Sequence, residues 1–484
     1  MADDVLDIGS RRELFVDHYL IDEFSNTDLA MHEPVRREVA LKFDNPWEGP
    51  FAGYITVLKD GDRYRMYYRG TENDRLEGGV VCYAESGDGI RWTKPDVGLY
   101  ECQGSTRNNI VFKGVHVIAH NFSPFIDANP DADPQARYKA LGGLYRYTKM
   151  PEVKGLYALA SPDGIHWRML QDAPVIGRPP QNAFDSQSAA FWSVPEKQYV
   201  CYFRLWTQTD TSNGNYLDGI RWIARATSPD FVHWSQPQIM EIRHGDSGAV
   251  PQFHLYTNQT SPYFRAPHIY IATPARFMPD RQVISEQHAR AIGVNPKYYH
   301  DCSDTLLLTS RGGNIFQQTF LEAFMRPGIG YEHWVSRTNY AALNIVQTSD
   351  SEMSIYVNHN YAQPTSHLRR FSLRLDGFAS LHAGFDDGWM LTKPLRFEAT
   401  GLFINYSTSA AGGIRVEICD PDGTALPGFE KVSCPEIIGN EIDRKVTWTS
   451  QPDLAALQGK PVRLRFHMKD CDLYSFVFRK GTAE

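Results

Sequence analysis

Short runs that alternate apolar and polar residues recur along the first four-fifths of the chain, and several of them end in the same turn signature. The signature reads Ser-x-Asp-Gly-x-x-Trp: residues 80–85 lead into a first copy at 86–92, and residues 156–160 lead into a second at 161–167. Asp and Gly suit the backbone of a tight hairpin, and the Trp can pack back between neighbouring sheets. The signature therefore predicts a repeated β-hairpin, with a structural rather than a catalytic role.

Later copies of the signature are increasingly altered. One stands at 228–234, a degraded copy stands at 310–316, and a last echo stands at 375–378. Two further strand-like runs precede each turn, so each repeat predicts a four-stranded antiparallel sheet. Five such sheets arranged radially form a β-propeller. The expected blades are 40–103, 104–178, 179–243, 244–325 and 326–384, with a helix-compatible insertion at 279–299 in blade four.

The pattern changes after residue 395. Short alternating runs such as 402–407 and 414–419 are separated by Asp-Gly, Gly-Gly and Pro turns, which is typical of a β-sandwich. The sequence therefore predicts an all-β chain, a five-bladed β-propeller with a C-terminal β-sandwich. The expected parts are an N-terminal segment 1–39 that packs on the propeller, the propeller itself at 40–384, and the sandwich at 385–484.

Composition agrees with this pattern and narrows the partners. Aromatic residues make up 13% of the chain, and 37 Gly and 29 Pro supply turns rather than helix interiors. The net charge is -8 and no long Lys/Arg run is present, which argues against a nucleic acid as the main partner. The sequence contains no run of about 18 apolar residues, which is the length needed to span a membrane. A neutral or weakly charged ligand fits better.

Neither a disulfide framework nor a metal or other cofactor is expected. The seven cysteines are scattered singly, so we interpret them as buried apolar residues. The spacings His300-Asp301-x-x-Asp304 and His116-x-x-x-His120 lie in or before strand-like segments, where they do not converge as they would on a helix. The acidic start after Met1 leaves the localisation open: cytoplasmic as written, or secreted or periplasmic with a leader removed. A homo-oligomer also remains open.

Three acids have a shared position in the first three repeats. Residues just before or at the start of each blade's first strand should line the mouth of an axial pocket, where acids from different blades face one another. Each acid lies 11 to 16 residues before a Tyr-rich second strand. A turn cap or a surface charge is the alternative for each. The three are Glu48, Asp127 and Asp185.

This arrangement resembles the five-bladed propeller glycosidases of glycoside hydrolase families 32, 43 and 68. In those families the first-blade acid is nucleophile or general base, the second-blade Asp stabilises the transition state or tunes a pKa, and the third-blade Glu is the general acid. The resemblance implies these roles for Glu48, Asp127 and Asp185 respectively. This chain has Glu where the first blade usually has Asp, and Asp where the third usually has Glu, so the identity of the proton donor stays open.

Further polar and aromatic residues are of the kinds that hold sugar hydroxyls and stack on sugar rings. A network of Arg and Glu that joins neighbouring blades is the alternative for the later ones. The expected substrate-binding residues are Trp47, Asn129, Gln187, Arg265, His268, Glu322, Arg326, Trp334, Arg337, Asn339, Tyr340 and Glu352.

The leading functional hypothesis is a glycoside hydrolase that cleaves a terminal sugar, furanose types included, with carboxylates from blades one to three. A phosphorylase or transglycosidase on the same fold is one alternative, with Arg265, Arg326 and Arg337 as possible phosphate ligands. A non-catalytic carbohydrate-binding propeller is another. The chain has no G-x-S-x-G elbow, phosphate-binding glycine loop or dinucleotide fingerprint, which argues against serine hydrolase and nucleotide chemistry.

Overall fold

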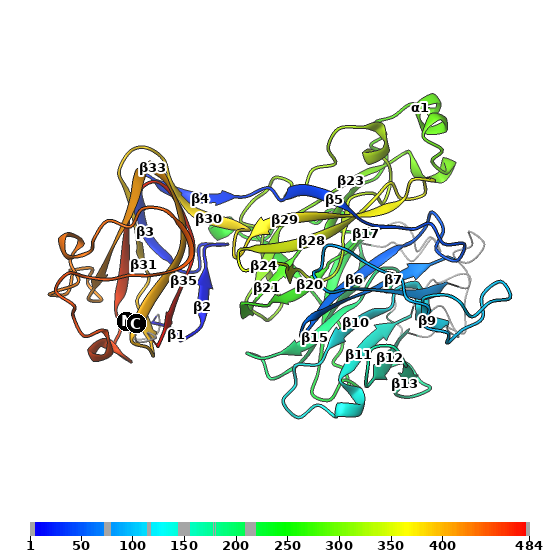
Figure 1. Cartoon of the computed structure of the whole chain (residues 1–484), viewed down its shortest axis with the longest axis horizontal. Helices are drawn as coiled ribbons and strands as arrows, with labels where there is room; N and C mark the ends of the chain where they lie inside the picture. Colours follow the sequence, from blue (N-terminus) through cyan, green and yellow to red (C-terminus); the bar gives the residue numbers. More distant parts are fainter. Residues whose placement is uncertain are drawn as a thin grey trace. The chain divides into compact units, whose positions relative to one another are not determined.

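The computed structural model of this chain describes residues 5–71, 79–113, 118–143, 155–177, 179, 181–208 and 219–480 (Figure 1). The chain divides into two compact units: Pro34–Ser372, and Met1–Glu33 together with Leu373–Glu484. The first unit is a five-bladed β-propeller, and the second is built on a curled antiparallel sheet. The predicted fold class is confirmed.

The first three blades run in order from an inner strand at the axis to a short outer strand. Their strands pair antiparallel, with a tight hairpin between the first and second strands in blades one and three. Blade one consists of β6 (Gly53–Asp60), β7 (Arg63–Gly70), β8 (Val80–Ser86) and β9 (Ile110–Lys113); blade two of β10 (Ser123–Ile126), β11 (Tyr138–Gly142), β12 (Gly155–Ser161), β13 (Arg168–Met169) and β14 (Ile176–Gly177); blade three of β15 (Ala189–Ser193), β16 (Gln198–Thr207), β17 (Ile220–Ser228) and β18 (Gln238–Ile239).

Blade four carries the predicted insertion. Its sheet contains β20 (Thr260–Tyr263), β21 (Ala266–Ala272), β24 (Leu308–Ser310), β25 (Ile315–Gln317) and, at the outer edge, β19 (Glu241–Arg243). Between β21 and β24 stand the hairpin of β22 (Ala275–Met278) and β23 (Cys302–Thr305) and the helix α1 (Glu286–Ala291). Ser285 caps α1 by accepting a hydrogen bond from the backbone N–H of His288. The helix-compatible insertion predicted at 279–299 is therefore confirmed.

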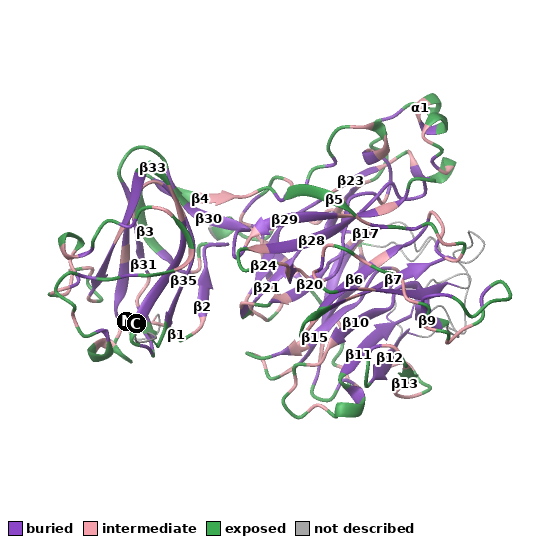
Figure 2. Ribbon diagram, viewed as in Figure 1, coloured by how far each residue is buried: buried purple, intermediate pink, exposed green. Residues whose placement is uncertain are grey.

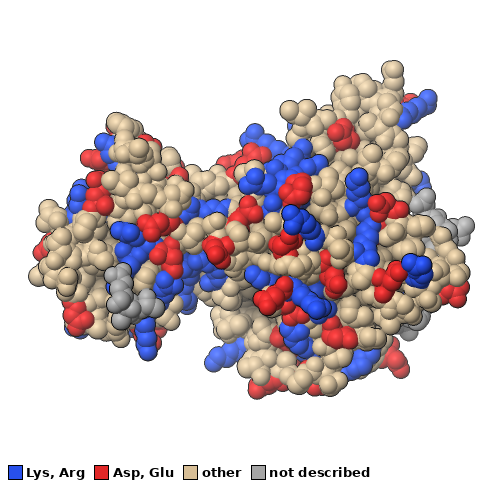
Figure 3. All heavy atoms as spheres, viewed as in Figure 1, with Lys and Arg blue, Asp and Glu red and all other residues tan. Residues whose placement is uncertain are grey.

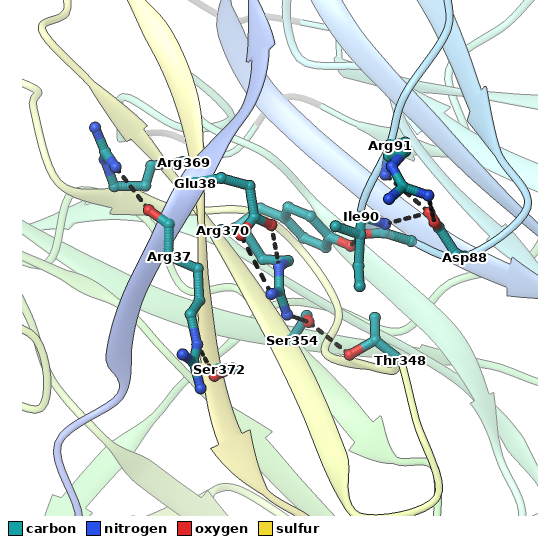
Figure 4. Close-up of polar contacts among 12 residues, drawn as sticks. Arg37, Glu38, Asp88, Ile90, Arg91, Thr348, Ser354, Arg369, Arg370 and Ser372 are labelled. Carbon is teal, nitrogen blue, oxygen red and sulfur yellow. Dashed lines mark hydrogen bonds and ion pairs between the residues drawn. The ribbon is translucent and has the colours of Figure 1, made fainter.

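The N-terminal part of the chain closes the ring. Blade five consists of β26 (Tyr340–Ala341), β27 (Val346–Gln347), β28 (Glu352–His359) and β29 (His367–Arg374), and its outer strand is β5 (Val35–Lys42). Figure 1 shows the blue β5 beside the yellow β29. Arg370 on β29 binds Glu38 on β5 and donates to Ser354 on β28 (Figure 4). The closing strand is thus held by side chains as well as by backbone pairing.

The middle strands of the blades are buried on both faces because each blade lies between two others. In β12 every residue is buried, and Figure 2 shows the same for much of β7 and β11, whereas β5 is mostly exposed. The Trp of the turn signature fills the space between blades: the ring of Trp167 meets that of Phe122 at 4.8 Å and that of Tyr67 in blade one at 6.1 Å. The structural role predicted for the signature is confirmed.

The second unit encloses its own core. Two long strands, β33 (Gly401–Cys419) and β35 (Arg463–Arg479), pair along most of their length, with a register shift between Thr408 and Gly413. Apolar residues from both halves of each strand belong to one buried cluster, so the bent strands form the two layers that a sandwich requires. The other strands are β1 (Leu6–Gly9), β2 (Arg12–Leu14), β3 (Ile21–Ser25), β4 (Thr27–Met31), β30 (Ala379–Ala383), β31 (Gly388–Thr392), β32 (Leu395–Phe397) and β34 (Asn440–Lys445).

The remaining short elements are 3-10 helices. All seven cysteines of the chain are buried and free, as expected. None of the helices in the ranges given above is long and apolar enough to cross a membrane. On the propeller face drawn in Figure 3, Lys and Arg side chains are interspersed with Asp and Glu. The 3-10 helices are Ile118–His120, Pro134–Ala136, Gly245–Ser247, Pro296–Tyr298, Tyr331–His333, Lys431–Ser433 and Leu454–Leu457.

The blade and domain limits differ from the expected ones at the outer strands. Strand β9 belongs to blade one although it lies beyond residue 103, and β19 belongs to blade four although it precedes residue 244. The expected segment 1–39 is divided: β2, β3 and β4 pair with strands of the C-terminal part, and β5 pairs with blade five. That C-terminal part begins at Leu373 rather than 385. Short or exposed strands lack the clear alternation that would have marked them.

Candidate functional site

A pocket lies at the propeller axis, at the end where the inner strands begin. Its enclosed volume is about 30 Å³, room for about one or two water molecules, so the side chains line it closely. All five blades contribute. The lining residues are Gly53, Tyr54, Ile55, Arg69, His120, Asp185, Gln187, Tyr256, Thr257, Gln259, Arg337, Tyr340, Ala341, Asn358 and Tyr361.

Asp185 is the one carboxylate among these described lining residues. It precedes β15, and its side chain is 20% exposed. Arg204, on β16, places a guanidinium nitrogen 2.7 Å from Oδ2, and His120 places Nε2 3.5 Å from Oδ1. The buried Arg204 stabilises a charged carboxylate here.

His120 brings a group that can exchange protons near neutral pH. It ends the 3-10 helix Ile118–His120, directly before blade two's inner strand. A guanidinium nitrogen of Arg69 lies 3.3 Å from its Nε2, and its ring meets that of Tyr54 edge-on at 5.6 Å. The neighbouring His116 of the predicted spacing lies outside the described residues.

Two further arginines line the pocket without a carboxylate partner among the described residues. Arg69 donates to the carbonyl of Phe51 at 2.7 Å and to the hydroxyl of Tyr361 at 3.2 Å. Arg337 lies over the rings of Tyr298 and Tyr256, at 4.7 and 5.3 Å from their centroids. Aromatic faces only partly compensate a buried positive charge, so the pocket carries an excess of positive charge.

Tyr256 is surrounded by this positive charge. The guanidinium groups of Arg204 and Arg221 lie 4.5 and 5.2 Å from its ring centroid. Burial acts to raise the pKa of Tyr256, but the charges of Arg337, Arg204 and Arg221 outweigh it and hold that pKa below its ordinary value. Burial instead raises the pKa of Tyr54 and of Tyr340. Tyr256 is therefore the pocket tyrosine best placed to lose its proton.

Several buried polar atoms of the lining residues have no hydrogen-bond partner within the part of the chain that the structure describes. They include both donors and acceptors, and buried polar groups in folded proteins are rarely left unpaired. Their gathering in one pocket makes this pocket a candidate site for a polar ligand. The atoms are Arg69 Nε, Arg337 Nε, Tyr340 OH, Gln259 Oε1 and Asn358 Oδ1.

Strained backbone occurs at the same place in four blades. Non-glycine residues adopt positive φ angles at the start of an inner strand or up to five residues before it: Tyr54 at 51°, Phe184 at 64°, Gln259 at 49° and Asn339 at 70°. Such conformations cost roughly 1 kcal/mol or more each and cluster where function requires a fixed geometry. They position the flanking side chains around the axis.

Glu48 does not line the axial pocket. Its side chain is fully buried inside blade one, where Oε1 accepts a hydrogen bond from Tyr68 at 2.5 Å. Its Oε2 accepts from the backbone N–H of Asn45 at 2.8 Å and pairs with Lys94 at 2.7 Å. These contacts hold the loop that enters β6.

Asp127 lies at the opposite end of its inner strand. Strand β10 ends at Ile126, so Asp127 follows the strand that His120 precedes. Its buried carboxylate pairs with Lys139 and accepts a hydrogen bond from Tyr199 at 2.7 Å. The structure therefore does not bring Glu48, Asp127 and Asp185 into one cleft.

Of the predicted substrate-binding residues, Gln187, Arg337 and Tyr340 line the pocket. Asn339 lies beside it, but its side-chain amide donates to the carbonyls of Ser303 and His333. The others lie elsewhere. Trp47 donates a hydrogen bond to Asn109, Asn129 donates to Tyr199, and Trp334 donates to the carbonyl of Gly328. Arg265 and His268 stand at the far end of blade four, Glu322 and Arg326 are exposed, and Glu352 pairs with Arg370.

Sequence reasoning missed His120, Arg69, Arg204 and Tyr256. Arg204 stands in a strand that is otherwise mostly apolar, and a charged residue in a buried strand is an unusual placement that could have marked it. Arg69 shares its strand with Arg63 and Arg65 and has no such mark. No comparable signal marks His120 or Tyr256. The described residues contain no group of three or more His, Cys, Asp or Glu side chains placed to bind a metal ion.

The fold and the pocket define this chain as a five-bladed propeller with a polar, positively charged axial site. No protein-family model and no curated protein matches the sequence. Among solved structures, an arabinoxylan arabinofuranohydrolase of glycoside hydrolase family 43 from Bacillus subtilis, in complex with cellotetraose, is 11% identical, with 93% of this chain and 99% of that chain covered and a TM-score of 0.38.

Two further solved structures are similar at comparably low identity. A family 32 β-fructofuranosidase from Bombyx mori is 9% identical, over 94% of this chain and 95% of that chain, with a TM-score of 0.41. An N-acetylgalactosamine deacetylase from F. plautii, in complex with blood group B trisaccharide, is 12% identical, over 73% and 97%, with a TM-score of 0.44. The chain is thus structurally similar to propeller glycoside hydrolases of families 43 and 32, at low identity. Likeness at this level concerns the fold alone.

Proposed function

We propose that this chain hydrolyses a glycosidic bond in the axial pocket, with Asp185 as the reacting carboxylate and His120 as the group that exchanges a proton beside it. The observation that carries the proposal is the set of buried donors and acceptors, unpaired within the described residues, in the pocket that Asp185 lines. A ligand with many hydroxyl groups offers both kinds of partner to such a set.

The chemistry rests on Asp185, the one carboxylate among the described residues that line the pocket. Glycoside cleavage passes through a positively charged, oxocarbenium-like state, and the carboxylate of Asp185 would stabilise that charge or activate water. Water supplies the oxygen that bonds to the anomeric carbon, and the leaving oxygen takes up a proton. His120 Nε2 lies 3.5 Å from Asp185 Oδ1. A small shift of either side chain would bring the two atoms to the hydrogen-bond distance that such a proton transfer needs.

A panel of aryl furanosides and aryl pyranosides, assayed with the wild-type protein and with Asp185→Asn, tests this proposal. We expect Asp185→Asn to lower kcat by about 10²- to 10⁴-fold, as for loss of a positioned acid or base. Glu48→Gln and Asp127→Asn are the matched controls, because both acids lie outside the pocket. Turnover that survives in Asp185→Asn but disappears in a folded Glu48→Gln or Asp127→Asn variant would overturn the assignment.

Phosphorolysis is a second candidate, because Arg69 and Arg337 line the pocket without a carboxylate partner in the described residues. Inorganic phosphate would then replace water as the acceptor. The same panel is therefore assayed with and without phosphate, with product analysed for a sugar phosphate. If the wild type binds sugars and Asp185→Asn binds them equally, with no turnover by either, the propeller is a binding module instead.

A further inference from the structure

The axial pocket has a feature that a site for neutral sugars does not require. Both Arg69 and Arg337 line it, and in the described residues neither guanidinium group pairs with a carboxylate. Asp185 is engaged by Arg204 at 2.7 Å. Two positive charges are thus left without a negative partner in a closely lined pocket.

The two arginines reach one cluster of tyrosines. Arg69 donates to the hydroxyl of Tyr361, and Arg337 lies over the ring of Tyr298, whose centroid is 5.6 Å from that of Tyr361. The Nε atoms of both arginines are buried without a hydrogen-bond partner among the described residues. A planar guanidinium presents paired N–H donors that match the two oxygens of a carboxylate or the oxygens of a phosphate.

We propose that Arg69 and Arg337 form a subsite for an oxyanion that enters the axial pocket with the substrate. The chemical class is an acidic sugar, such as a uronic acid, whose carboxylate binds these arginines, or free phosphate at the same groups. The acidic-sugar form rests on the proposed glycosidase function, because the sugar must place its anomeric carbon near Asp185.

Electrostatics favours an anion over a neutral ligand here. Burying an unpaired guanidinium is costly unless a negative group compensates it. Tyr256, also in the pocket, has its pKa held below the ordinary value despite its burial, by Arg337 together with Arg204 and Arg221. The positive field that favours a tyrosinate would equally favour a bound carboxylate.

Binding of monosaccharides tests the subsite without any turnover, since they contain no glycosidic bond. Titration calorimetry on the whole chain would compare galacturonate and glucuronate with galactose and glucose, and would include inorganic phosphate as a separate arm. We expect the wild type to bind at least one of the anions, and Arg337→Met to weaken that binding by at least about tenfold. Arg337→Lys keeps the charge but loses the paired donors, so an intermediate loss is expected.

The control is Arg326→Met, which removes an exposed arginine outside the pocket. If the wild type prefers uronates to neutral sugars and Arg337→Met abolishes that preference, the oxyanion belongs to the sugar. If the wild type binds phosphate in a way that depends on Arg337 and shows no preference for uronates, the oxyanion is phosphate. Equal binding of neutral and acidic sugars, or anion binding that a folded Arg337→Met variant retains, would overturn the subsite. These binding results do not depend on hydrolysis. If the protein cleaves only neutral aryl glycosides, the glycosidase proposal stands and the proposal of an acidic-sugar substrate is contradicted.

Discussion

Glu48 and Asp185 show how differently two acids in similar sequence positions can be placed. Both stand a few residues before an inner strand. Asp185 lines the axial pocket, whereas Glu48 points into blade one and binds Tyr68 and Lys94. A change of backbone direction over one or two residues decides this, and loop residues leave no periodic pattern in the sequence. The position of these acids was predictable, but their direction was not.

We predict that Glu48 contributes to stability rather than to turnover. Glu48→Gln should lower the free energy of unfolding by about 1–3 kcal/mol, because one amide oxygen cannot accept from Tyr68, Asn45 and Lys94 together. Urea unfolding measures the loss. The control is Asp44→Asn, since Asp44 pairs with the same Lys94 but is 70% exposed and should change stability by no more than about 0.5 kcal/mol. Equal losses in the two variants would contradict this interpretation.

A second prediction concerns the ionisation of Tyr256. Its pKa is held below the ordinary value of about 10 because Arg337, Arg204 and Arg221 outweigh the effect of burial. Ultraviolet difference titration should therefore show one tyrosine that ionises early and is missing in Tyr256→Phe. Because the folded-state pKa is the lower one, the ionised form adds stability as the pH rises through it, and this stability is lost as the pH falls back.

Tyr54→Phe is the matched control for that titration, because burial raises the pKa of Tyr54. It should leave the early transition in place. Arg337→Met should move the transition upward, since it removes one of the positive charges that favour the tyrosinate. An early transition that persists unchanged in Tyr256→Phe would show that another group titrates.

At the scale of elements, the turn signature was the most informative part of the sequence. In its second copy, Ser161 accepts from the backbone N–H of Gly164, and Asp163 accepts from the N–H groups of Ile165 and His166. These local hydrogen bonds make the hairpin recognisable without tertiary information. The inner strand of blade two was misplaced because a long connection, which contains the 3-10 helix Pro134–Ala136, separates β10 from β11. The fixed offset to the second strand therefore fell on Asp127 instead of His120.

We predict that the turn aspartates stabilise the protein in a pH-dependent way. Burial acts to raise the pKa of Asp163, but hydrogen bonds from His166 and Ile165 outweigh it and hold that pKa well below its ordinary value. Asp163→Ala should cost about 0.5–1 kcal/mol at pH 7, with the low end expected because the side chain is half exposed. Since the folded-state pKa is depressed, this stability is present above about pH 4 and is lost progressively as the pH falls.

Unfolding of wild type and Asp163→Ala by urea at pH 7 and at pH 3 measures this dependence. The difference in the free energy of unfolding between the two proteins should shrink at pH 3, because Asp163 is protonated in the unfolded chain but still charged in the folded turn. Asp172→Ala provides a control in the same blade, outside the signature. A difference that stays constant between the two pH values would show that the carboxylate charge does not contribute.

At the scale of the molecule, the five repeats predicted the ring but not how it closes. Strand β5 has the sequence Val-Arg-Arg-Glu-Val-Ala-Leu-Lys, and six of its eight residues are exposed. An edge strand with so little burial shows no clear alternation of apolar and polar residues. Closure by a strand from the N-terminal part joins residues 35–42 to residues 367–374. The sheet of blade five therefore forms only when both ends of the propeller are present.

We predict that Arg370 is a principal side-chain contact of this closure. Its guanidinium is 6% exposed and binds Glu38 on β5 and Ser354 at 3.0 Å (Figure 4). It also pairs with Glu352 at 2.7 Å. Arg370→Met should lower the free energy of unfolding by about 1–3 kcal/mol, because it leaves two carboxylates facing each other without the positive charge between them. The neighbouring Arg369 donates only to the carbonyl of Arg37 among its described contacts, so Arg369→Met should cost no more than about 0.5 kcal/mol. Hydrogen exchange of β5 amides, faster in Arg370→Met than in Arg369→Met, would locate the loss at the closing strand, whereas equal exchange in both variants would place the stability of the ring in backbone pairing alone.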